Sequence, residues 1–122
     1  MAGAVLTVFA GVGFAMFLRR KKYWLKLHKM LNSAGSLFFV VGFSLIFILL
    51  WEQGAYHLGG VHQIIGLTTV ILALITLLAG FYQLKAGGKA PLVRQYHRWL
   101  GRLVLALSVV SLLTGLRLAG II

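Results

Sequence analysis

Four long apolar stretches are the feature that most constrains the fold of this chain. They cover residues 2–18, 30–51, 61–84 and 99–122, and each is close to the ~20 residues that a helix needs to cross a bilayer. The stretches are continuous, without the alternation of apolar and polar residues that marks the strands of a membrane barrel. The sequence therefore predicts an all-α protein, in which residues 1–122 form one transmembrane domain of four antiparallel helices in up-down order.

The overall composition agrees with a chain that is solvated by lipid. Of its residues, 61% are hydrophobic and only 11% are charged, whereas an ordinary soluble domain has about a quarter charged residues. A net charge of +11 would suggest nucleic acid as the partner of a soluble protein, but here we expect lipid and no nucleic acid. The first apolar stretch is followed, not preceded, by its basic residues, so we interpret it as a retained helix and not as a cleaved signal peptide.

The basic residues predict how the chain is oriented in the membrane. Eleven of the twelve Lys and Arg residues lie in two clusters, whereas the loop between the second and third stretches holds the only acidic residue, Glu52, and no Lys or Arg. Positively charged loops tend to remain in the cytoplasm. We therefore expect an integral, multi-pass protein of the cell or inner membrane with both termini outside the cytoplasm. The clusters are Arg19, Arg20, Lys21, Lys22, Lys26 and Lys29, and Lys85, Lys89, Arg94, Arg98 and Arg102.

A repeat with an offset of 35 residues relates the third apolar stretch to the fourth. Six residues of the third stretch recur as the same residue type in the fourth: His62, Gly66, Leu72, Leu77, Leu78 and Gly80 match His97, Gly101, Leu107, Leu112, Leu113 and Gly115. The second stretch shares the opening histidine, His28, at an offset of 34 residues.

Histidine is the only strong metal-binding side chain that the sequence offers in number. The absence of cysteine excludes disulfides, iron–sulfur clusters and covalent haem attachment. His28, His62 and His97 each stand where a helix is expected to begin, so His28 and His97 share the inner depth while His62 lies at the outer one. The helices that carry His28 and His97 are expected to lie diagonally across the bundle. Their imidazoles could therefore bind a haem iron from opposite sides, and we take His28, His97 and His62 as candidate metal ligands.

Small or polar residues follow the histidines on the same helix faces. Asn32 and Gly35 follow His28, Gly66 follows His62, and Gly101 follows His97, at spacings of four or seven residues. These positions would let the helix backbone approach a haem, and we predict that they face it. The same pattern also allows helices to pack closely in lipid without any cofactor, and this alternative remains open.

Three segments of the sequence resemble the cytochrome b561 superfamily of transmembrane electron carriers, and the likeness covers nearly the whole chain. They are the histidine-bearing segments Trp24-Leu25-Lys26-Leu27-His28, His62-Gln63-Ile64-Ile65-Gly66 and His97-Arg98-Trp99-Leu100-Gly101. The resemblance implies a four-helix core with two b haems that carries electrons from a reductant on one face to an acceptor on the other.

The chain departs from this family pattern in its first apolar stretch, which has no histidine. In the family, a histidine there would pair with the residue that matches His62. The resemblance therefore supports His28 and His97 as a complete axial pair and leaves His62 without its partner. His57, Met1 or a residue of a neighbouring subunit could supply the missing ligand.

From these observations we predict a b-type cytochrome that binds one haem b, with a second as a further possibility, and that carries single electrons. Two histidine ligands leave no open position on the iron, which favours electron transfer over dioxygen binding. The expected partners are other redox subunits or an electron donor and acceptor, with a quinone as a further candidate. Two alternatives remain: a cofactor-free structural subunit of a larger membrane complex, and a quinol-oxidising membrane anchor of a dehydrogenase.

Overall fold

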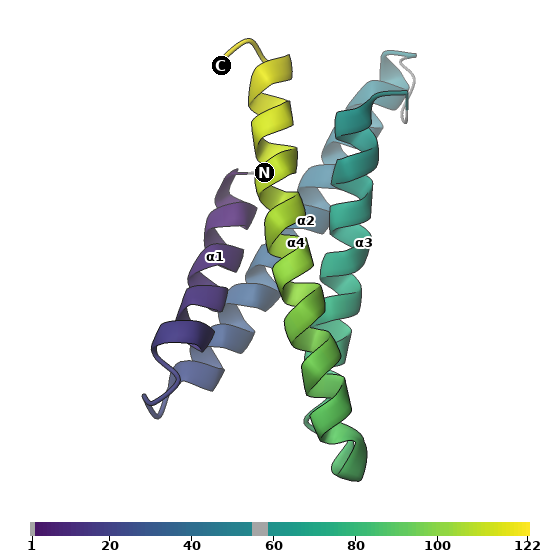
Figure 1. The fold of residues 1–122 in the computed structure, drawn as a ribbon. Helices are drawn as coiled ribbons and strands as arrows, with labels where there is room; N and C mark the ends of the chain where they lie inside the picture. Colours follow the sequence, from purple (N-terminus) through teal and green to yellow (C-terminus); the bar gives the residue numbers. More distant parts are fainter. Residues whose placement is uncertain (1, 55–58) are drawn as a thin grey trace.

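The described part of the protein, residues 2–54 and 59–122 of a computed structural model, is built from helices and contains no strand (Figure 1). This confirms the all-α prediction. The elements in chain order are α1 (Ala2–Phe17), α2 (Trp24–Glu52), α3 (Val61–Tyr82), the short 3₁₀ helix η1 (Gly87–Lys89) and α4 (Ala90–Leu118).

Among residues 2–54 and 59–122, three segments are long and apolar enough to cross a membrane. They are α2, α3 and the continuous segment formed by η1 and α4, with mean hydropathies of 2.4, 2.5 and 1.8 over their most apolar windows. These helices identify the chain as an integral membrane protein. The fourth helix, α1, has 16 residues and extends over only about 24 Å, which is less than the ~30 Å thickness of the hydrocarbon core.

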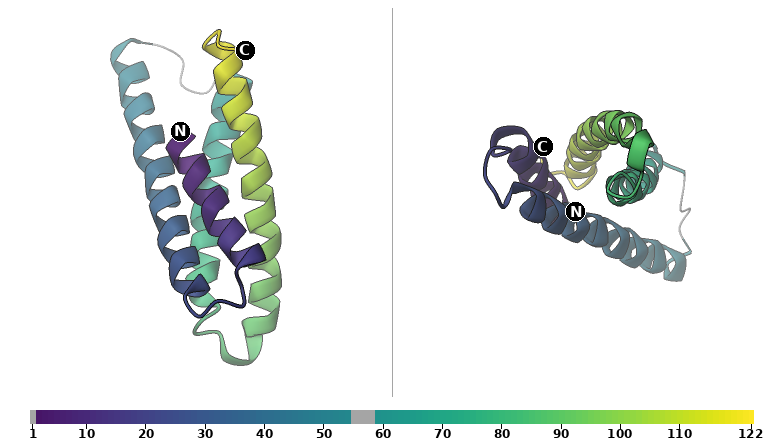
Figure 2. Two further views of the ribbon diagram at one scale, coloured as in Figure 1. Left: turned by 90° about the vertical axis from the view of Figure 1, so that its left-hand side faces the viewer. Right: turned by 90° about the horizontal axis from the view of Figure 1, so that it is seen from below.

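The helices pack around a closed square, with α1 against α2, α2 against α3, α3 against α4 and α4 against α1. The pairs α1–α2 and α3–α4 form the most extensive contacts, and α2 and α4 lie diagonally opposite, with no close approach of their backbones. Figure 2 shows α1 on one side of the bundle, with its first residues well below the upper ends of α2 and α4. The diagonal relation of α2 and α4, on which the proposed histidine pair depends, is therefore present.

Two helices begin earlier than their apolar stretches suggest. We expected helices from about residues 30 and 99, whereas α2 begins at Trp24 and α4 at Ala90. The apolar stretch marks the part of a helix that needs lipid, and a helix can continue beyond it because its backbone hydrogen bonds form in water as well. Pro91 lies in the first turn of α4. Backbone N–H groups in that turn have no acceptor within the helix, so the missing N–H of proline is not a disadvantage there.

The turn before α4 depends on a glycine. Gly87 has a φ of +53°, a left-handed conformation that side chains disfavour. It allows the chain to leave α3 and start α4 within a few residues. This short connection keeps α3 and α4 adjacent over most of their length.

Each of the four helices contributes to the small core at the middle of the bundle. The buried apolar residues are Val8, Phe39, Val70, Ala73 and Val104. Buried hydroxyl groups accompany them, and those of Thr69 and Ser108 donate to the carbonyl oxygens of Ile65 and Val104, each at 2.7 Å. These bonds within one helix satisfy polar groups that would otherwise be costly in an apolar environment.

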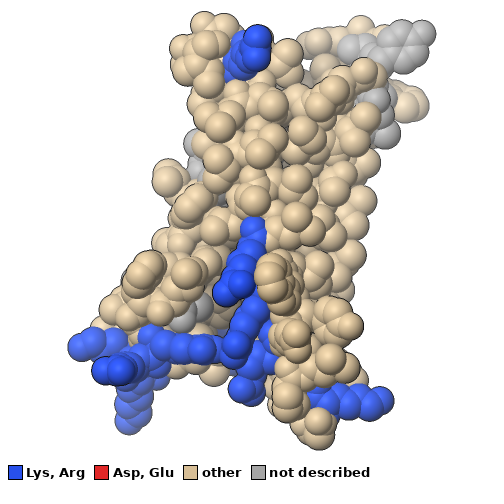
Figure 3. All heavy atoms as spheres, viewed as in Figure 1, with Lys and Arg blue, Asp and Glu red and all other residues tan. Residues whose placement is uncertain are grey.

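The Lys and Arg side chains gather mainly at one end of the molecule, which we call the basic end (Figure 3). This end contains the α1–α2 turn and the start of α4. Two arginines there lie over tryptophan rings, Arg19 over Trp24 at 5.6 Å and Arg102 over Trp99 at 5.2 Å. Such cation–π contacts are typical of side chains that anchor a helix at a membrane interface.

Candidate functional site

His28 lies in the second turn of α2, near the basic end, and its ring is held by α1. Its Nδ1 atom is 2.9 Å from the carbonyl oxygen of Gly11. Because a carbonyl oxygen can only accept, Nδ1 of the neutral ring carries the proton and Nε2 keeps its lone pair. Asn32, one turn further along α2, donates from Nδ2 to the backbone oxygen of His28 at 2.8 Å. The ring of His28 is therefore held by its bond to α1, and Nε2, the nitrogen that could bind a metal, takes no part in that bond.

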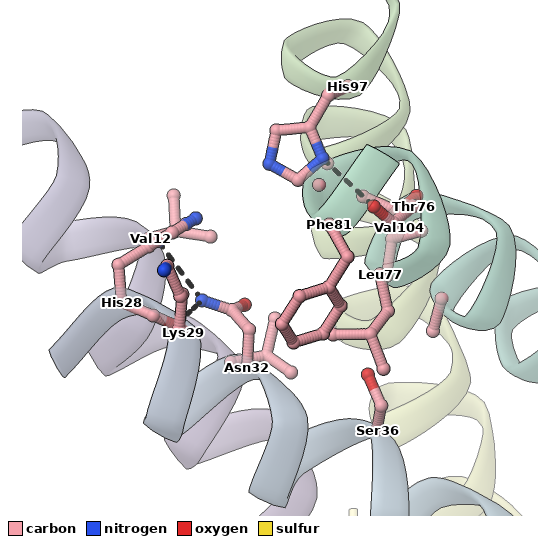
Figure 4. A pocket seen from close by; sticks show the side chains of 14 residues that line it. Val12, His28, Lys29, Asn32, Ser36, Thr76, Leu77, Phe81, His97 and Val104 are labelled. Atoms are coloured by element: carbon pink, nitrogen blue, oxygen red, sulfur yellow. Dashed lines mark hydrogen bonds between the residues drawn. The ribbon is translucent and has the colours of Figure 1, made fainter. Parts of the chain in front are cut away.

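His97 in α4 is held in the same manner by α3. Its Nδ1 atom is 2.9 Å from the backbone oxygen of Thr76, as the dashed line in Figure 4 shows. Here too the proton lies on Nδ1 and the lone pair on Nε2. Metal-binding histidines commonly donate their second N–H to such a carbonyl group, which fixes the ring orientation and raises the basicity of the ligand nitrogen.

The two rings lie close together across the diagonal of the bundle. Their centroids are 6.0 Å apart and their planes are nearly perpendicular, at 89°. Two imidazoles that each bind the same metal ion at about 2 Å would have ring centres on the order of 6 Å apart. The observed separation is therefore of the size that a shared metal ion requires.

A cavity between all four helices surrounds the two histidines (Figure 4). The space between atoms here is about 540 Å³ when the part open to the surroundings is counted with it. Apart from the histidines its walls are mainly apolar, with Val8 and Val12 of α1, Leu77 of α3 and Val104 of α4 among them. A mainly apolar wall with a few convergent polar groups is the usual lining of a cofactor site.

These residues fit a haem better than a bare metal ion. Among residues 2–54 and 59–122 no group of three or more histidine, cysteine or acidic side chains could hold a metal, whereas a structural zinc site needs four protein ligands. A haem brings four nitrogen ligands of its own and needs only the two axial ones. His28 and His97 could supply these two, and both line the same cavity.

Of the four small or polar residues that were predicted to face a haem, two line the cavity and two do not. Asn32 and Gly101 line the cavity together with His28 and His97. Gly35 and Gly66 are buried but do not belong to its lining. Gly66 instead faces α4, where a Cβ atom at its position would lie 3.8 Å from Oγ of Ser111.

His62 lies at the other end of the bundle, away from this pair. Its Nδ1 atom is 2.9 Å from Oγ1 of Thr114 in α4. The single proton of the Thr114 hydroxyl can be accepted by the backbone oxygens of Val110 and Ser111, at 2.9 and 3.1 Å, and with the proton placed there the hydroxyl oxygen accepts from Nδ1 of His62. The lone pair of His62 is therefore on Nε2, as in the other two histidines. His57 and Met1, considered as its partners, lie outside the described residues.

Several residues that shape these sites were not predicted as such. Gly11 and Thr76 act through their backbone oxygens, which leave no signal in a sequence. Thr114 has a side-chain role, but nothing in its spacing from His62 indicated a contact between different helices. Gly80 and Gly115, which pack against histidine rings, could have been found, because the 35-residue repeat relates them to each other as it relates His62 to His97.

Comparison with known proteins matches the chain to a family. The family model described as eukaryotic cytochrome b561 matches residues 1–121. No curated protein and no solved structure matches the chain.

Proposed function

The chain belongs to the cytochrome b561 family, and from this premise we propose that it is a transmembrane b-type cytochrome that carries single electrons with haem b bound between His28 and His97. The observation that carries the proposal is the geometry of this pair. Each Nδ1 is fixed by a backbone carbonyl group, each Nε2 is left with its lone pair, and the ring centroids are 6.0 Å apart inside a mainly apolar cavity.

A bound haem would supply the one-electron chemistry, which protein side chains do not provide. The protein has three tasks. His28 and His97 would supply its two protein ligands, a set that favours electron transfer over dioxygen binding. Gly11 and Thr76 hold the two rings in place through their carbonyl groups. Val8, Val12 and Val104 keep water away, which lowers the reorganisation that accompanies a change of charge.

One site near the basic end cannot carry an electron across the membrane alone, because the hydrocarbon core is about 30 Å thick. The proposal therefore includes an outer electron-transfer partner. His62 is the candidate ligand for a second haem, with its Nε2 lone pair available and its second ligand supplied by His57, Met1 or a neighbouring subunit. A quinone or a separate redox subunit is the alternative.

The orientation of the protein follows from its charges. We propose that the basic end faces the cytoplasm and that the α2–α3 connection and both termini lie on the opposite side, because Lys and Arg are retained on the cytoplasmic side. The clustering of these residues at one end of the molecule supports this orientation. An electron donor or a redox subunit in the cytoplasm would then meet the His28–His97 end.

Optical spectra of the purified protein test the proposal. After expression with added haem precursor, the dithionite-reduced protein should show the sharp bands of low-spin haem b, extractable with acidic acetone since no cysteine can attach it. A redox titration should give a reversible one-electron transition. Protein that is folded and correctly inserted but colourless would contradict the proposal and favour the cofactor-free structural subunit. A haem spectrum with reduction by quinol alone would favour the membrane anchor of a dehydrogenase.

A further inference from the structure

Residues that the 35-residue repeat relates make corresponding contacts between α3 and α4. A Cβ atom at Gly80 of α3 would lie 2.9 Å from Cε1 of His97, and one at Gly115 of α4 would lie 3.0 Å from Cε1 of His62. Gly80 and Gly115 are equivalent in the repeat, as are His62 and His97. Each helix therefore carries a histidine in its first part and, near its C-terminal end, the glycine that the histidine of the neighbouring helix contacts.

The spacing within each helix explains why this exchange works. Eighteen residues separate His62 from Gly80, and eighteen separate His97 from Gly115. An α-helix has 3.6 residues per turn, so this distance corresponds to about five complete turns and places both residues on the same face, roughly 27 Å apart. Since α3 and α4 pack against each other along these faces, the histidine of one helix meets the glycine of the other at both ends.

A second pair of reciprocal contacts supports the same relation. A Cβ atom at Gly101 would lie 3.9 Å from Cγ2 of Thr76, and one at Gly66 would lie 3.8 Å from Oγ of Ser111. Gly66 and Gly101 are equivalent in the repeat, and Thr76 and Ser111 are also 35 residues apart. The two halves of the α3–α4 pair thus use corresponding positions for corresponding contacts. These two contacts are ordinary in length, whereas a Cβ atom at Gly80 would lie closer to His97 than real Cβ atoms do, and one at Gly115 would be tighter against His62 than most real Cβ contacts.

The His97 ring has little freedom to move away from Gly80. A Cβ atom there would lie 3.3 Å from Nδ1 and 3.6 Å from Nε2 of His97 as well as 2.9 Å from Cε1, so the ring lies directly beside the glycine. The same ring is held by the bond from Nδ1 to the backbone oxygen of Thr76. Any side chain at position 80 would therefore have to rotate the ring or break this bond.

We propose that Gly80 and Gly115 are positioning residues that set the orientation of the His97 and His62 imidazoles. The inference rests on the proposed function for its consequence, because the plane of an axial imidazole influences the electronic structure of the haem iron to which it binds. On this view α3 and α4 form a duplicated unit, with Gly80 and His97 at the basic end and Gly115 and His62 at the outer end.

The test compares Gly80→Ala and Gly115→Ala with Gly13→Ala, because a Cβ atom at Gly13 would meet nothing within 4 Å. The proteins are labelled with ¹³C at the histidine Cε1, which is the atom closest to both added methyl groups, and the signals are assigned by replacing each histidine in turn. NMR spectra are recorded on the reduced, diamagnetic holoprotein in micelles. EPR spectra of the oxidised protein report the orientation of the axial rings.

Gly80→Ala should shift the Cε1–H signal of His97 and change the low-spin EPR signal, and Gly115→Ala should shift the Cε1–H signal of His62. Gly13→Ala should leave both signals at their wild-type positions. Loss of haem from Gly80→Ala in a protein that remains folded also supports the inference, since it shows that the ring no longer binds. If Gly80→Ala does not accumulate in the membrane, Gly115→Ala carries the same test at the other end.

Unchanged histidine signals in both alanine variants would overturn the inference. This outcome differs from a failure of the proposed function, which would appear in the wild-type protein as the absence of haem. In a haem-free protein the Cε1–H shifts can still be measured, so the effect of each glycine on its histidine can be decided even then.

Discussion

The two ends of the bundle contain the same histidine–glycine arrangement but surround it differently. At the basic end, His97 of α4 meets His28 of α2, and residues of all four helices line the cavity around them. At the outer end, His62 contacts Thr114 and Gly115 of α4. α1 contributes Val8 and Val12 to the lining of the cavity at the basic end.

The hydrogen-bond acceptors of the two repeated histidines also differ. His97 donates directly to the backbone oxygen of Thr76. Ser111 is the residue that corresponds to Thr76 in the repeat, and its backbone oxygen accepts instead from the Thr114 hydroxyl, which in turn accepts from His62. At the outer end, the Thr114 hydroxyl thus lies between the histidine ring and the backbone oxygen. The inner ring is held by a backbone atom that substitution cannot remove, whereas the outer ring depends on a side chain.

The largest expected effect concerns the inner pair. His28→Ala and His97→Ala should each abolish the low-spin haem spectrum of the basic end, because a single imidazole cannot fill both axial positions. Tyr96→Phe is the control, since Tyr96 adjoins His97 in sequence but is exposed. Retention of the wild-type spectrum and haem content by either alanine variant would show that the pair does not bind haem.

The same experiment on His62 defines the outer end. If wild-type protein binds one haem per chain, His62→Ala should leave its spectrum unchanged, and His62 is then a packing or interfacial residue. If it binds two, His62→Ala should lose one of them. Loss of the same haem in His57→Ala would assign the second ligand to the α2–α3 loop, while its retention there would point to Met1 or to another chain. Haem per chain is measured by the pyridine haemochrome assay against protein concentration.

The orientation of the two ends in the membrane gives a second all-or-none result. The chain has no cysteine, so Gln53→Cys or Gly88→Cys introduces a single thiol, the first in the α2–α3 connection and the second at the basic end. An impermeant maleimide applied to intact cells should label Gln53→Cys, and should label Gly88→Cys only after the membrane is opened. The reverse pattern would invert the proposed orientation.

The sequence predicted some of these features because they depend on patterns of side chains. Continuous apolar stretches identify helices in lipid, and the histidine positions placed His28 and His97 at one depth on helices that the structure confirms as diagonal. The bounds of α1, Ala2–Phe17, agree with the predicted stretch 2–18, but this helix is not among the candidate membrane spans. The early starts of α2 and α4 were missed, since hydropathy locates lipid-facing segments and not the ends of helices. The carbonyl groups of Gly11 and Thr76 could not be predicted, because every residue carries one and only the packing selects among them.

A smaller effect should separate the inner end from the rest of the bundle. Gly11→Ala would place a methyl group into the side-chain amide of Asn32 and 3.2 Å from Cβ of Leu31. We expect a loss of about 1–3 kcal/mol in stability, as for other overpacked positions, together with weaker haem binding because the Gly11 carbonyl orients His28. Gly13→Ala, two residues away in α1, should be neutral or slightly stabilising. Thermal unfolding in detergent measures both, and equal stability of the two variants would contradict the tight α1–α2 contact.

The smallest expected effect concerns the Thr114 hydroxyl at the outer end. Thr114→Val keeps the shape of the side chain but removes the acceptor for Nδ1 of His62, which leaves a half-buried N–H group without this partner and costs about 1 kcal/mol or slightly more. If His62 binds a haem, the affinity of the Thr114→Val protein for that haem should fall by roughly tenfold, as when other partners of metal-binding histidines are removed. Thr114→Ser retains the hydroxyl and should behave like the wild type, and the spectrum of the inner haem should not change in either variant because the carbonyl group of Thr76 is unaffected. Equal haem loss and equal stability in the valine and serine variants would show that the Thr114 hydroxyl does not hold His62. The difference between a backbone acceptor for His97 and a side-chain acceptor for His62 would then have no energetic consequence.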